Sequence, residues 1–167
     1  MPGEYDTAVF PDAAFAEGRT VPVEFKPNEY HTVTPYLVVD GAAQLIEFMV
    51  DVLGGTELMR LPGPEGRLGH AEVRVGDSVV MLADAPSPHD VMPAMLHLYV
   101  EDADALYERA IGHGATSLRE PTTEFYGDRM AGVRDVLGNK WYFATHVEDI
   151  APEEMSRRAA ELAAAAP

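Results

Sequence analysis

An internal repeat constrains the fold of this sequence more than any other feature. The segment LVVDGAAQLIEFMVDVLGGT (37–56) aligns with LYVEDADALYERAIGHGAT (98–116), at an offset of 61 residues from Leu37 to Leu98. Each copy reads as a strand, an acidic turn, an amphipathic helix and a glycine stop. The match resumes downstream, where Met81 lies opposite Tyr142 at the same offset. The repeat predicts two βαβββ modules, over about 32–86 and 94–147.

Both predicted helices have one apolar face. Apolar side chains recur at helical spacing in each copy, at Ala42, Leu45, Ile46, Met49, Val52 and Leu53 and again at Ala103, Leu106, Tyr107, Ala110 and Ile111. Such a face packs on a sheet, because a stripe of this width must be removed from water. The expected class is α+β, with two βαβββ modules forming a curved sheet.

Alternation along the strands separates two sheet faces, since residues two apart share a side. One face is wholly apolar and should lie under the helices. It comprises Leu37, Val39, Ala71, Val73, Val75, Val80, Leu82, Leu96, Leu98, Val100, Trp141 and Phe143.

The other face mixes polar and large apolar side chains. It includes Thr34, Tyr36, His70, Glu72, Arg74, Met81, Met95, His97, Tyr99 and Tyr142. A solvated face of an ordinary sheet has such a mixture, but the tyrosine, methionine and histidine content favours a concave surface around a ligand.

Three segments lie outside the repeat. Residues 1–31 form an arm without clear periodicity, and the proline-rich segment 85–93 is a linker. Residues 150–167 are expected to form a helix with Pro152 in its first turn. Its apolar stripe is Met155, Ala159, Leu162 and Ala166. This helix either docks on its own domain or crosses to a partner subunit.

The composition excludes several classes of partner. With 28 acidic and 12 basic residues, the net charge is −16, which repels phosphate backbones and anionic bilayers. Neither nucleic acid nor a membrane is therefore an expected partner. The acidic N-terminus has no secretory signal and no apolar run could span a bilayer, which favours a cytoplasmic location. The absence of cysteine excludes disulfides and thiolate zinc sites.

The paired modules, with FMVDVLGG (48–55) and GVRDVLGNKWYFATHVED (132–149), resemble the vicinal oxygen chelate superfamily of glyoxalase I, bleomycin-resistance proteins and extradiol dioxygenases. The chain is most similar to the PhnB-like group, over residues 32–149. The resemblance implies the fold and a homodimer whose cavities are built from two chains. It implies no single activity, because the superfamily contains several enzyme classes and also binding proteins.

Metal-dependent members of this superfamily take four ligands, His or Glu, from the first and last strands of each module. The matching positions here are Thr34, Met81, Met95 and Tyr142. A hydroxyl, two thioethers and a phenol bind divalent metals weakly. We therefore expect no metal at these positions and no other cofactor. Without a Lewis acid, the metal-dependent chemistry of the superfamily has no basis.

His97 and Glu72 are weak candidates for acid–base catalysis. His97 lies two residues beyond Met95 on the same face, where it could contact a ligand or serve as a structural, hydrogen-bonded histidine. His70, Glu72 and His97 could instead form a two-histidine, one-carboxylate metal site. The favoured alternative is that Glu72 and Arg74 make cross-strand ion pairs on a wet part of the sheet.

Several other residues are candidate ligand contacts. Tyr36, Tyr99 and Tyr142 offer aromatic walls with a hydroxyl, and Met81 and Met95 offer soft surfaces, although all five could be ordinary packing residues. Thr34 joins this set as a ligand position of the resembled family. The loop 121–135 borders the cavity mouth in that family, which makes Tyr126 and Arg129 candidates.

Two functions follow from these residues. The first is a protein that binds a small organic molecule, expected to be aromatic, in a sheet-lined cavity without the usual metal site. The alternative is a lyase, isomerase or dioxygenase that uses a displaced metal at His70, Glu72 and His97, or acid–base chemistry by His97 and Glu72. A third possibility is that the arm and the terminal helix serve assembly with a protein partner.

Overall fold

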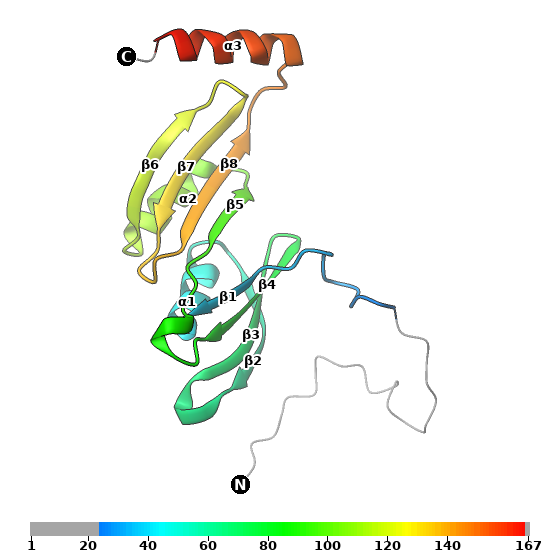
Figure 1. Cartoon of the computed structure of the whole chain (residues 1–167), viewed down its shortest axis with the longest axis vertical. Helices are drawn as coiled ribbons and strands as arrows, with labels where there is room; N and C mark the ends of the chain where they lie inside the picture. Colours follow the sequence, from blue (N-terminus) through cyan, green and yellow to red (C-terminus); the bar gives the residue numbers. More distant parts are fainter. Residues whose placement is uncertain (1–23, 166–167) are drawn as a thin grey trace.

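A computed structural model of the chain describes residues 24–165 and contains two successive βαβββ modules (Figure 1). The first comprises β1 (Tyr36–Val39), α1 (Ala42–Asp51), β2 (Thr56–Pro62), β3 (Leu68–Val75) and β4 (Ser78–Asp84). The second comprises β5 (Met95–Tyr99), α2 (Ala103–Gly112), β6 (Thr116–Thr123), β7 (Asp128–Arg134) and β8 (Lys140–His146). Short 3-10 helices η2 (Pro64–Gly66) and η3 (Pro88–Asp90) lie in the connections. The α+β class and the repeat are confirmed.

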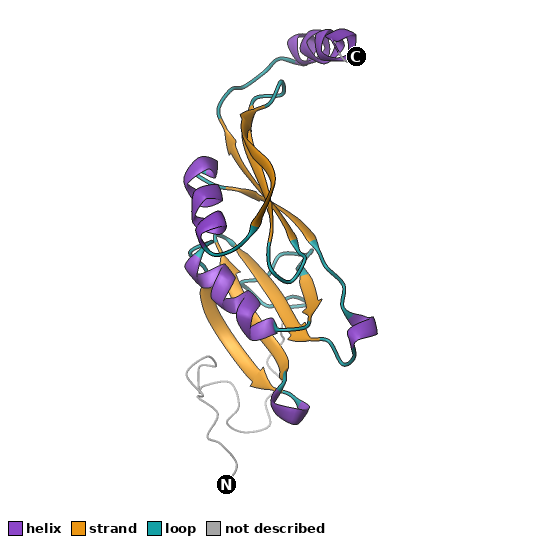
Figure 2. Ribbon diagram, turned by 90° about the vertical axis from the view of Figure 1, so that its left-hand side faces the viewer, coloured by secondary structure: helices purple, strands orange, loops and turns teal. Residues whose placement is uncertain are grey.

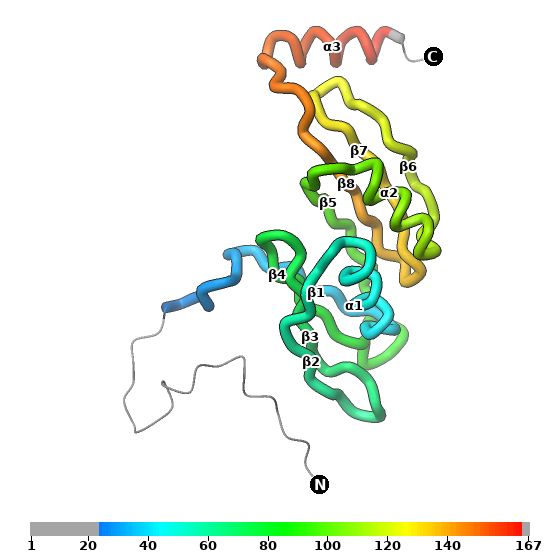
Figure 3. The backbone as a smooth tube through the Cα atoms, turned by 180° about the vertical axis from the view of Figure 1, so that it is seen from behind, coloured from blue at the N-terminus to red at the C-terminus, as the bar shows by residue number. Residues whose placement is uncertain are grey.

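Each module forms its own four-stranded mixed sheet. The strand orders are β1-β4-β3-β2 and β5-β8-β7-β6, with β1 parallel to β4 and β5 parallel to β8. Both α1 and α2 lie on the same side of the molecule, each beside the sheet of its own module (Figure 2, Figure 3). The equal topologies follow from the equal sequence patterns of the two copies.

The apolar faces of the sheets form the core, as the strand alternation predicts. Leu37, Val73, Leu82 and Phe143 are fully buried, and α1 and α2 contribute their apolar faces to the same cluster. The ring of Phe48 on α1 lies 5.6 Å from that of Trp141 on β8, centroid to centroid. One continuous core therefore joins the two modules.

The last strand of each module also caps the helix of that module. The Asp84 carboxylate accepts hydrogen bonds from the backbone N–H groups of Gly41 (3.0 Å), Ala42 (2.8 Å) and Leu68 (2.6 Å). Burial alone would raise the pKa of Asp84, but these three donors hold it below its usual value. In the second module the repeat-equivalent Thr145 accepts from Ala103 N at 2.9 Å. In each module, therefore, a side chain 42 positions further along the chain accepts hydrogen bonds from backbone N–H groups at the start of the helix, which have no partner within the helix.

The DVLGNKW turn between β7 and β8 is built around the buried carboxylate of Asp135. Its Oδ1 accepts from the backbone N–H groups of Leu137 and Asn139, both at 2.9 Å. Its Oδ2 accepts from Asn139 Nδ2 (2.8 Å) and Trp141 Nε1 (2.9 Å). The Asn139 side chain in turn accepts from Ala94 N, just before β5 (3.0 Å). This motif therefore joins the turn, the tryptophan and the start of the second module.

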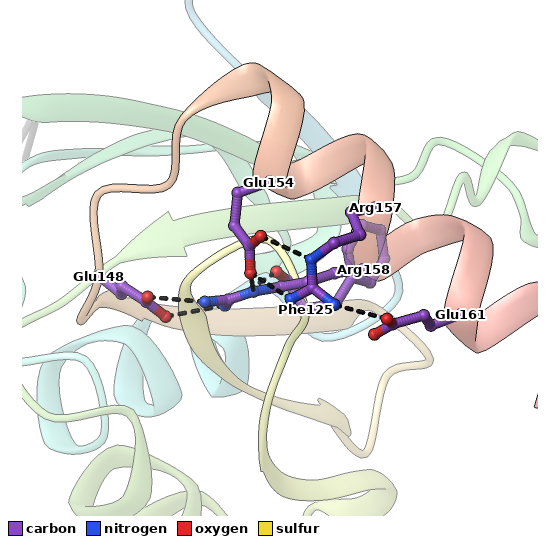
Figure 4. Close-up of polar contacts among 6 residues, drawn as sticks. All are labelled: Phe125, Glu148, Glu154, Arg157, Arg158 and Glu161. Carbon is purple, nitrogen blue, oxygen red and sulfur yellow. Dashed lines mark hydrogen bonds and ion pairs between the residues drawn. The ribbon is translucent and has the colours of Figure 1, made fainter.

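The predicted terminal helix is α3 (Pro152–Ala165), which projects from the second module (Figure 1). Arg158 attaches it to Glu148, at 2.8 and 2.9 Å, and Arg157 pairs with Glu154 and Glu161 within the helix (Figure 4). The helix makes no extensive contact with any other described helix or strand, and Leu162 is exposed. Ala166 of the expected stripe lies outside the described residues.

The arm is described only from residue 24 onward, and residues 1–23 of the predicted segment lie outside the described part. Glu29 forms an ion pair with Arg74 on β3, and Tyr30 hydrogen bonds to Glu72 on the same strand. The end of the arm therefore lies on the first sheet. Among the described helices, none combines the length and apolar character needed to span a bilayer.

Candidate functional site

One candidate site is a groove between the two modules, which we call the intermodule groove, with a volume of about 1130 Å³. The first module contributes Pro35, Leu53, Gly54, Val80 and the β3–β4 turn, Val75–Ser78. The second contributes Leu96–Glu101, Trp141, Thr145 and His146. Side chains from both faces of β5 line the groove, because β5 is the edge strand of its sheet.

Two of the predicted ligand contacts, His97 and Tyr99, line this groove. Their rings are 5.2 Å apart and meet edge to face at 64°. Tyr99 donates its hydroxyl proton to Asp128 Oδ2 at 3.0 Å, and this bond raises the pKa of Tyr99. His97 has no such polar partner among the described side chains, so its ring is available to a molecule in the groove.

His146, which the sequence analysis did not single out, lies at the same end of the groove. Its Nδ1 is 2.8 Å from Asp128 Oδ1 and its Nε2 is 3.0 Å from Asp149 Oδ1. The hydrogen bonds to Asp128 and Asp149 raise the pKa of His146 despite a small opposing effect of desolvation. Its strand parity, shared with Tyr142, is the sequence signal that could have placed it on this face.

A second polar cluster lies on the first sheet. Tyr36 Oη is 3.1 Å from His70 Nδ1, and His70 Nε2 is 3.1 Å from Glu72 Oε1. Tyr30 donates to Glu72 Oε2 at 2.5 Å, and burial followed by this bond raises the pKa of Tyr30 to about 12. We call Tyr30, Tyr36, His70 and Glu72 the tyrosine–histidine cluster. Met81 lies on the same face, paired with both Tyr36 and Glu72.

This cluster corrects the expectation of wet ion pairs at Glu72 and Arg74. Glu72 is only 7% exposed and its partners are Tyr30 and His70, while Arg74 pairs with Glu29 of the arm. The arm supplies Tyr30 and Glu29, the two partners that were not expected. Because the arm has no periodic pattern, no sequence signal indicated this contact.

Tyr126 and Arg129 do not line the intermodule groove. Arg129 forms a bidentate ion pair with Asp104 in the first turn of α2, at 2.6 and 2.7 Å, which lowers the pKa of Asp104. The Tyr126 hydroxyl is 3.6 Å from the sulfur of Met130. Any contact of these two residues with a ligand stays a prediction.

The family of the chain follows from its sequence match. The sequence model of the Glyoxalase/Bleomycin resistance protein/Dioxygenase superfamily matches residues 30–143. The chain belongs to this superfamily. An uncharacterized protein of Mycobacterium tuberculosis, Rv0887c, is 33% identical over 150 residues, which cover 83% of this chain and 86% of that protein. Mb0911c of Mycobacterium bovis, also uncharacterized, is 35% identical over 139 residues, covering 77% and 91%.

Several solved structures share the fold. Protein PA1353 from Pseudomonas aeruginosa is 21% identical with a TM-score of 0.60, covering 70% of this chain and 98% of that one. A glyoxalase/bleomycin resistance protein/dioxygenase from Nocardioides is 20% identical with a TM-score of 0.54, covering 79% and 91%. A PhnB protein from Bacillus cereus is 14% identical with a TM-score of 0.56, covering 69% and 99%.

The four positions that match superfamily metal ligands do not fit a divalent cation. Thr34 precedes β1, Met81 is half-buried on β4, Met95 is exposed at the start of β5, and the Tyr142 ring packs over Gly132. Their hydroxyl, thioether and phenol groups are poor ligands for such metals. His70 and Glu72 touch each other while His97 lies on the other module, and residues 24–165 contain no group of three metal-binding side chains.

Proposed function

We propose that this superfamily member binds a small, planar apolar organic molecule in the intermodule groove, without metal at the superfamily ligand positions. The groove itself carries this proposal. Its volume of about 1130 Å³ is slightly above the usual range for small-molecule sites, so a small organic molecule has room in it. Leu96, Leu98 and Trp141 supply apolar walls, and polar side chains lie among them.

The polar residues of the groove would orient such a molecule. His97 and Tyr99 present an imidazole and a phenol from β5, and His146 lies beside them. Aromatic side chains bind planar ligands by offset stacking or edge contacts, which add specificity to apolar burial. The carboxylates of Asp77 and Glu101 at the groove favour neutral or cationic ligands over anions.

Blocking the groove is expected to weaken the binding of a neutral apolar probe. N-phenyl-1-naphthylamine should bind the wild-type chain with a rise in its fluorescence. Ser78→Phe places a ring in the groove and should weaken binding by about tenfold or more, which corresponds to roughly 1.4 kcal/mol. Fluorescence titration measures both affinities.

The matched control is Ser117→Phe on β6, which adds the same ring outside the groove and should leave the affinity unchanged. Equal affinities for the two variants, or no binding to the wild-type chain, would contradict the proposal. A calorimetric screen of neutral and cationic aromatic compounds then identifies the ligand class.

Adding divalent metal is expected to leave the thermal stability unchanged. Zn²⁺, Ni²⁺, Mn²⁺ or Fe²⁺ at about 100 µM should shift the melting temperature by less than about 1 °C, because a weak donor set gives little linkage. Metal analysis of the purified chain should give well below one metal per chain. Stoichiometric metal, or a shift of several degrees, would instead support the alternative of a lyase, isomerase or dioxygenase with a displaced metal site.

We also propose that two copies of the chain associate. Met95 and Tyr99 on the edge strand β5 are each 68% exposed, and α3 exposes Met155 and Leu162. Unpaired strand edges and apolar helix faces are surfaces that a second subunit commonly covers.

Light scattering should therefore give twice the chain mass of 18.2 kDa. Truncation after Val147 removes α3 and should shift the mass toward that of one chain. The helix is attached to its own domain mainly through Arg158, which leaves its exposed apolar side chains for a second subunit to cover. A dimer that survives truncation would exclude α3 from the interface. A monomeric full-length chain would refute the association.

A further inference from the structure

The tyrosine–histidine cluster is a linear chain of hydrogen bonds that crosses three segments. From solvent inward it runs from the Tyr36 phenol on β1 through the His70 imidazole to the Glu72 carboxylate on β3, with both contacts at 3.1 Å. Tyr30 of the arm closes the inner end on Glu72 Oε2. None of these four residues lines the intermodule groove, so the cluster is a separate site.

The donors and acceptors of this chain define the proton positions. The carboxylate of Glu72 accepts from Tyr30 at one oxygen and faces His70 Nε2 with the other. His70 Nε2 therefore carries a proton that it donates to Glu72, as in other carboxylate–imidazole pairs. The lone pair of Nδ1 is left to accept the Tyr36 hydroxyl proton.

Exposure increases along the hydrogen-bonded chain from Glu72 to Tyr36, so its reactive end faces solvent. Glu72 is 7% exposed, His70 is half-buried, and Tyr36 is 48% exposed. The Tyr36 ring also lies 5.6 Å from the His70 ring at 37°. The orienting groups are thus held by the sheet and the arm, while the phenol oxygen can meet a molecule from outside. A hydroxyl next to a base that a third group orients is the arrangement of an activated nucleophile.

We propose that Tyr36 is the nucleophile of a metal-independent acyl-transfer site whose substrates are activated esters of small carboxylic acids. Tyr36 Oη forms a bond to the acyl carbon while its proton moves to His70 Nδ1. The ester C–O bond breaks, and the leaving oxyanion of the activated ester takes that proton from His70. Water then attacks the aryl ester on Tyr36, His70 accepts the water proton and returns it to the phenolate, and the carboxylic acid leaves.

Tyr36 and His70 are the catalytic residues of this site, because both exchange protons with the reacting groups, and Glu72 is a positioning residue that acts through His70. Glu72 holds one imidazole tautomer and would stabilise the imidazolium that forms during each transfer. The chain also contains an internal comparison. Tyr99 is 68% exposed, more than Tyr36, but its hydroxyl donates directly to the Asp128 carboxylate, which raises its pKa.

Phenylmethanesulfonyl fluoride tests the proposal on the full-length chain. Attack by Tyr36 Oη forms an O–S bond and breaks the S–F bond, with fluoride leaving and the phenol proton passing to His70. Peptide mass spectrometry should find Tyr36 labelled at least about tenfold faster than the more exposed Tyr99. Equal or slower labelling of Tyr36 would overturn the proposal, and this comparison needs no variant.

Variants then test the base and the residue that positions it. His70→Ala should slow Tyr36 labelling by about tenfold or more, and free imidazole should restore it, which a merely structural role would not allow. Glu72→Gln should slow labelling several-fold. His89→Asn, an exposed histidine of η3, is the matched control and should label like the wild type. Unchanged labelling in His70→Ala, or labelling that EDTA abolishes, would refute the proposed base.

Turnover of an ester completes the test. Hydrolysis of 4-nitrophenyl acetate by the wild-type chain should fall by about tenfold or more in Tyr36→Phe, which keeps the ring and removes only the hydroxyl. Equal rates in the two proteins would overturn the acyl-transfer step. The outcome is independent of probe binding in the intermodule groove, so each proposal can fail alone.

Discussion

Replacing Asp135 with alanine is expected to lower the free energy of unfolding by about 3–5 kcal/mol, enough to remove much of the stability of an ordinary domain. The Asp135 side chain is 4% exposed and accepts four hydrogen bonds. Alanine leaves four donors of Leu137, Asn139 and Trp141 without this acceptor in a dry environment. Buried unsatisfied donors cost about 1–3 kcal/mol each, although such costs do not add fully.

Urea denaturation measures this loss, and Trp141, the single tryptophan, reports on the site by fluorescence. The emission of the folded variant should also shift, since Trp141 Nε1 loses its partner. Asp149→Ala is the control, because Asp149 is fully exposed and should change the stability by less than about 0.5 kcal/mol. A loss below about 1 kcal/mol in Asp135→Ala would show that the motif does not hold the turn.

Gly127→Ala is expected to cost about 3 kcal/mol or more, from two separate causes. Gly127 has φ +97°, a backbone conformation that is strained for a residue with a side chain. In addition, a Cβ atom at this position would overlap the carbonyl oxygen of Glu148. The backbone N–H groups of Val147 and Glu148 both donate to Gly127 O, so the clash cannot be relieved without breaking these bonds.

Gly76→Ala separates the two causes. Gly76 also has a positive φ, +58°, but its Cβ would meet no atom within 4 Å, so only the backbone strain of about 1–2 kcal/mol remains. Urea denaturation of both variants gives the difference. If the two variants lose the same free energy of unfolding, the overlap of the added Cβ atom at position 127 with the Glu148 carbonyl oxygen has no cost. We also expect Gly127→Ala to loosen α3, because Arg158 is attached to Glu148.

Residues 24–165 contain two clusters of tyrosine, histidine and carboxylate, and these differ in the order of their members. In the first module the histidine lies between Tyr36 and Glu72, whereas in the second Asp128 lies between Tyr99 and His146. An imidazole can accept a proton from a phenol and pass it on, but a carboxylate bonded directly to the phenol only holds the proton in place. This order therefore distinguishes Tyr36, a candidate nucleophile, from Tyr99, whose hydroxyl is structural.

Much of the fold could be predicted from the sequence because its signals are local. Strand alternation assigned Leu37, Val73 and Phe143 to the buried face, and helical spacing did the same for Leu45 and the rest of its stripe. The same alternation placed Tyr36, His97 and Tyr99 on the opposite face. It could not say which polar groups would meet, because period and propensity act over a few residues only.

The partners of the candidate residues come from segments that are distant in the chain. Glu72 meets Tyr30 across 42 positions, and Tyr99 meets Asp128 across 29. The arm has no periodic pattern, so its contact with β3 was not expected. Likewise, Arg129 meets Asp104 of α2 across 25 positions, a partner that no local pattern indicated.

The sequence by itself determined the two βαβββ modules, the apolar faces and the loss of good metal ligands at Thr34, Met81, Met95 and Tyr142, since these depend on residue type and spacing. Only the tertiary structure decided that His97 and Tyr99 line a groove between modules and that Tyr36, His70 and Glu72 form one hydrogen-bonded chain. The reason is physical. A groove and a proton path depend on how whole elements are placed relative to one another. The packing of Phe48 against Trp141 helps to set that placement, and no local sequence pattern encodes it.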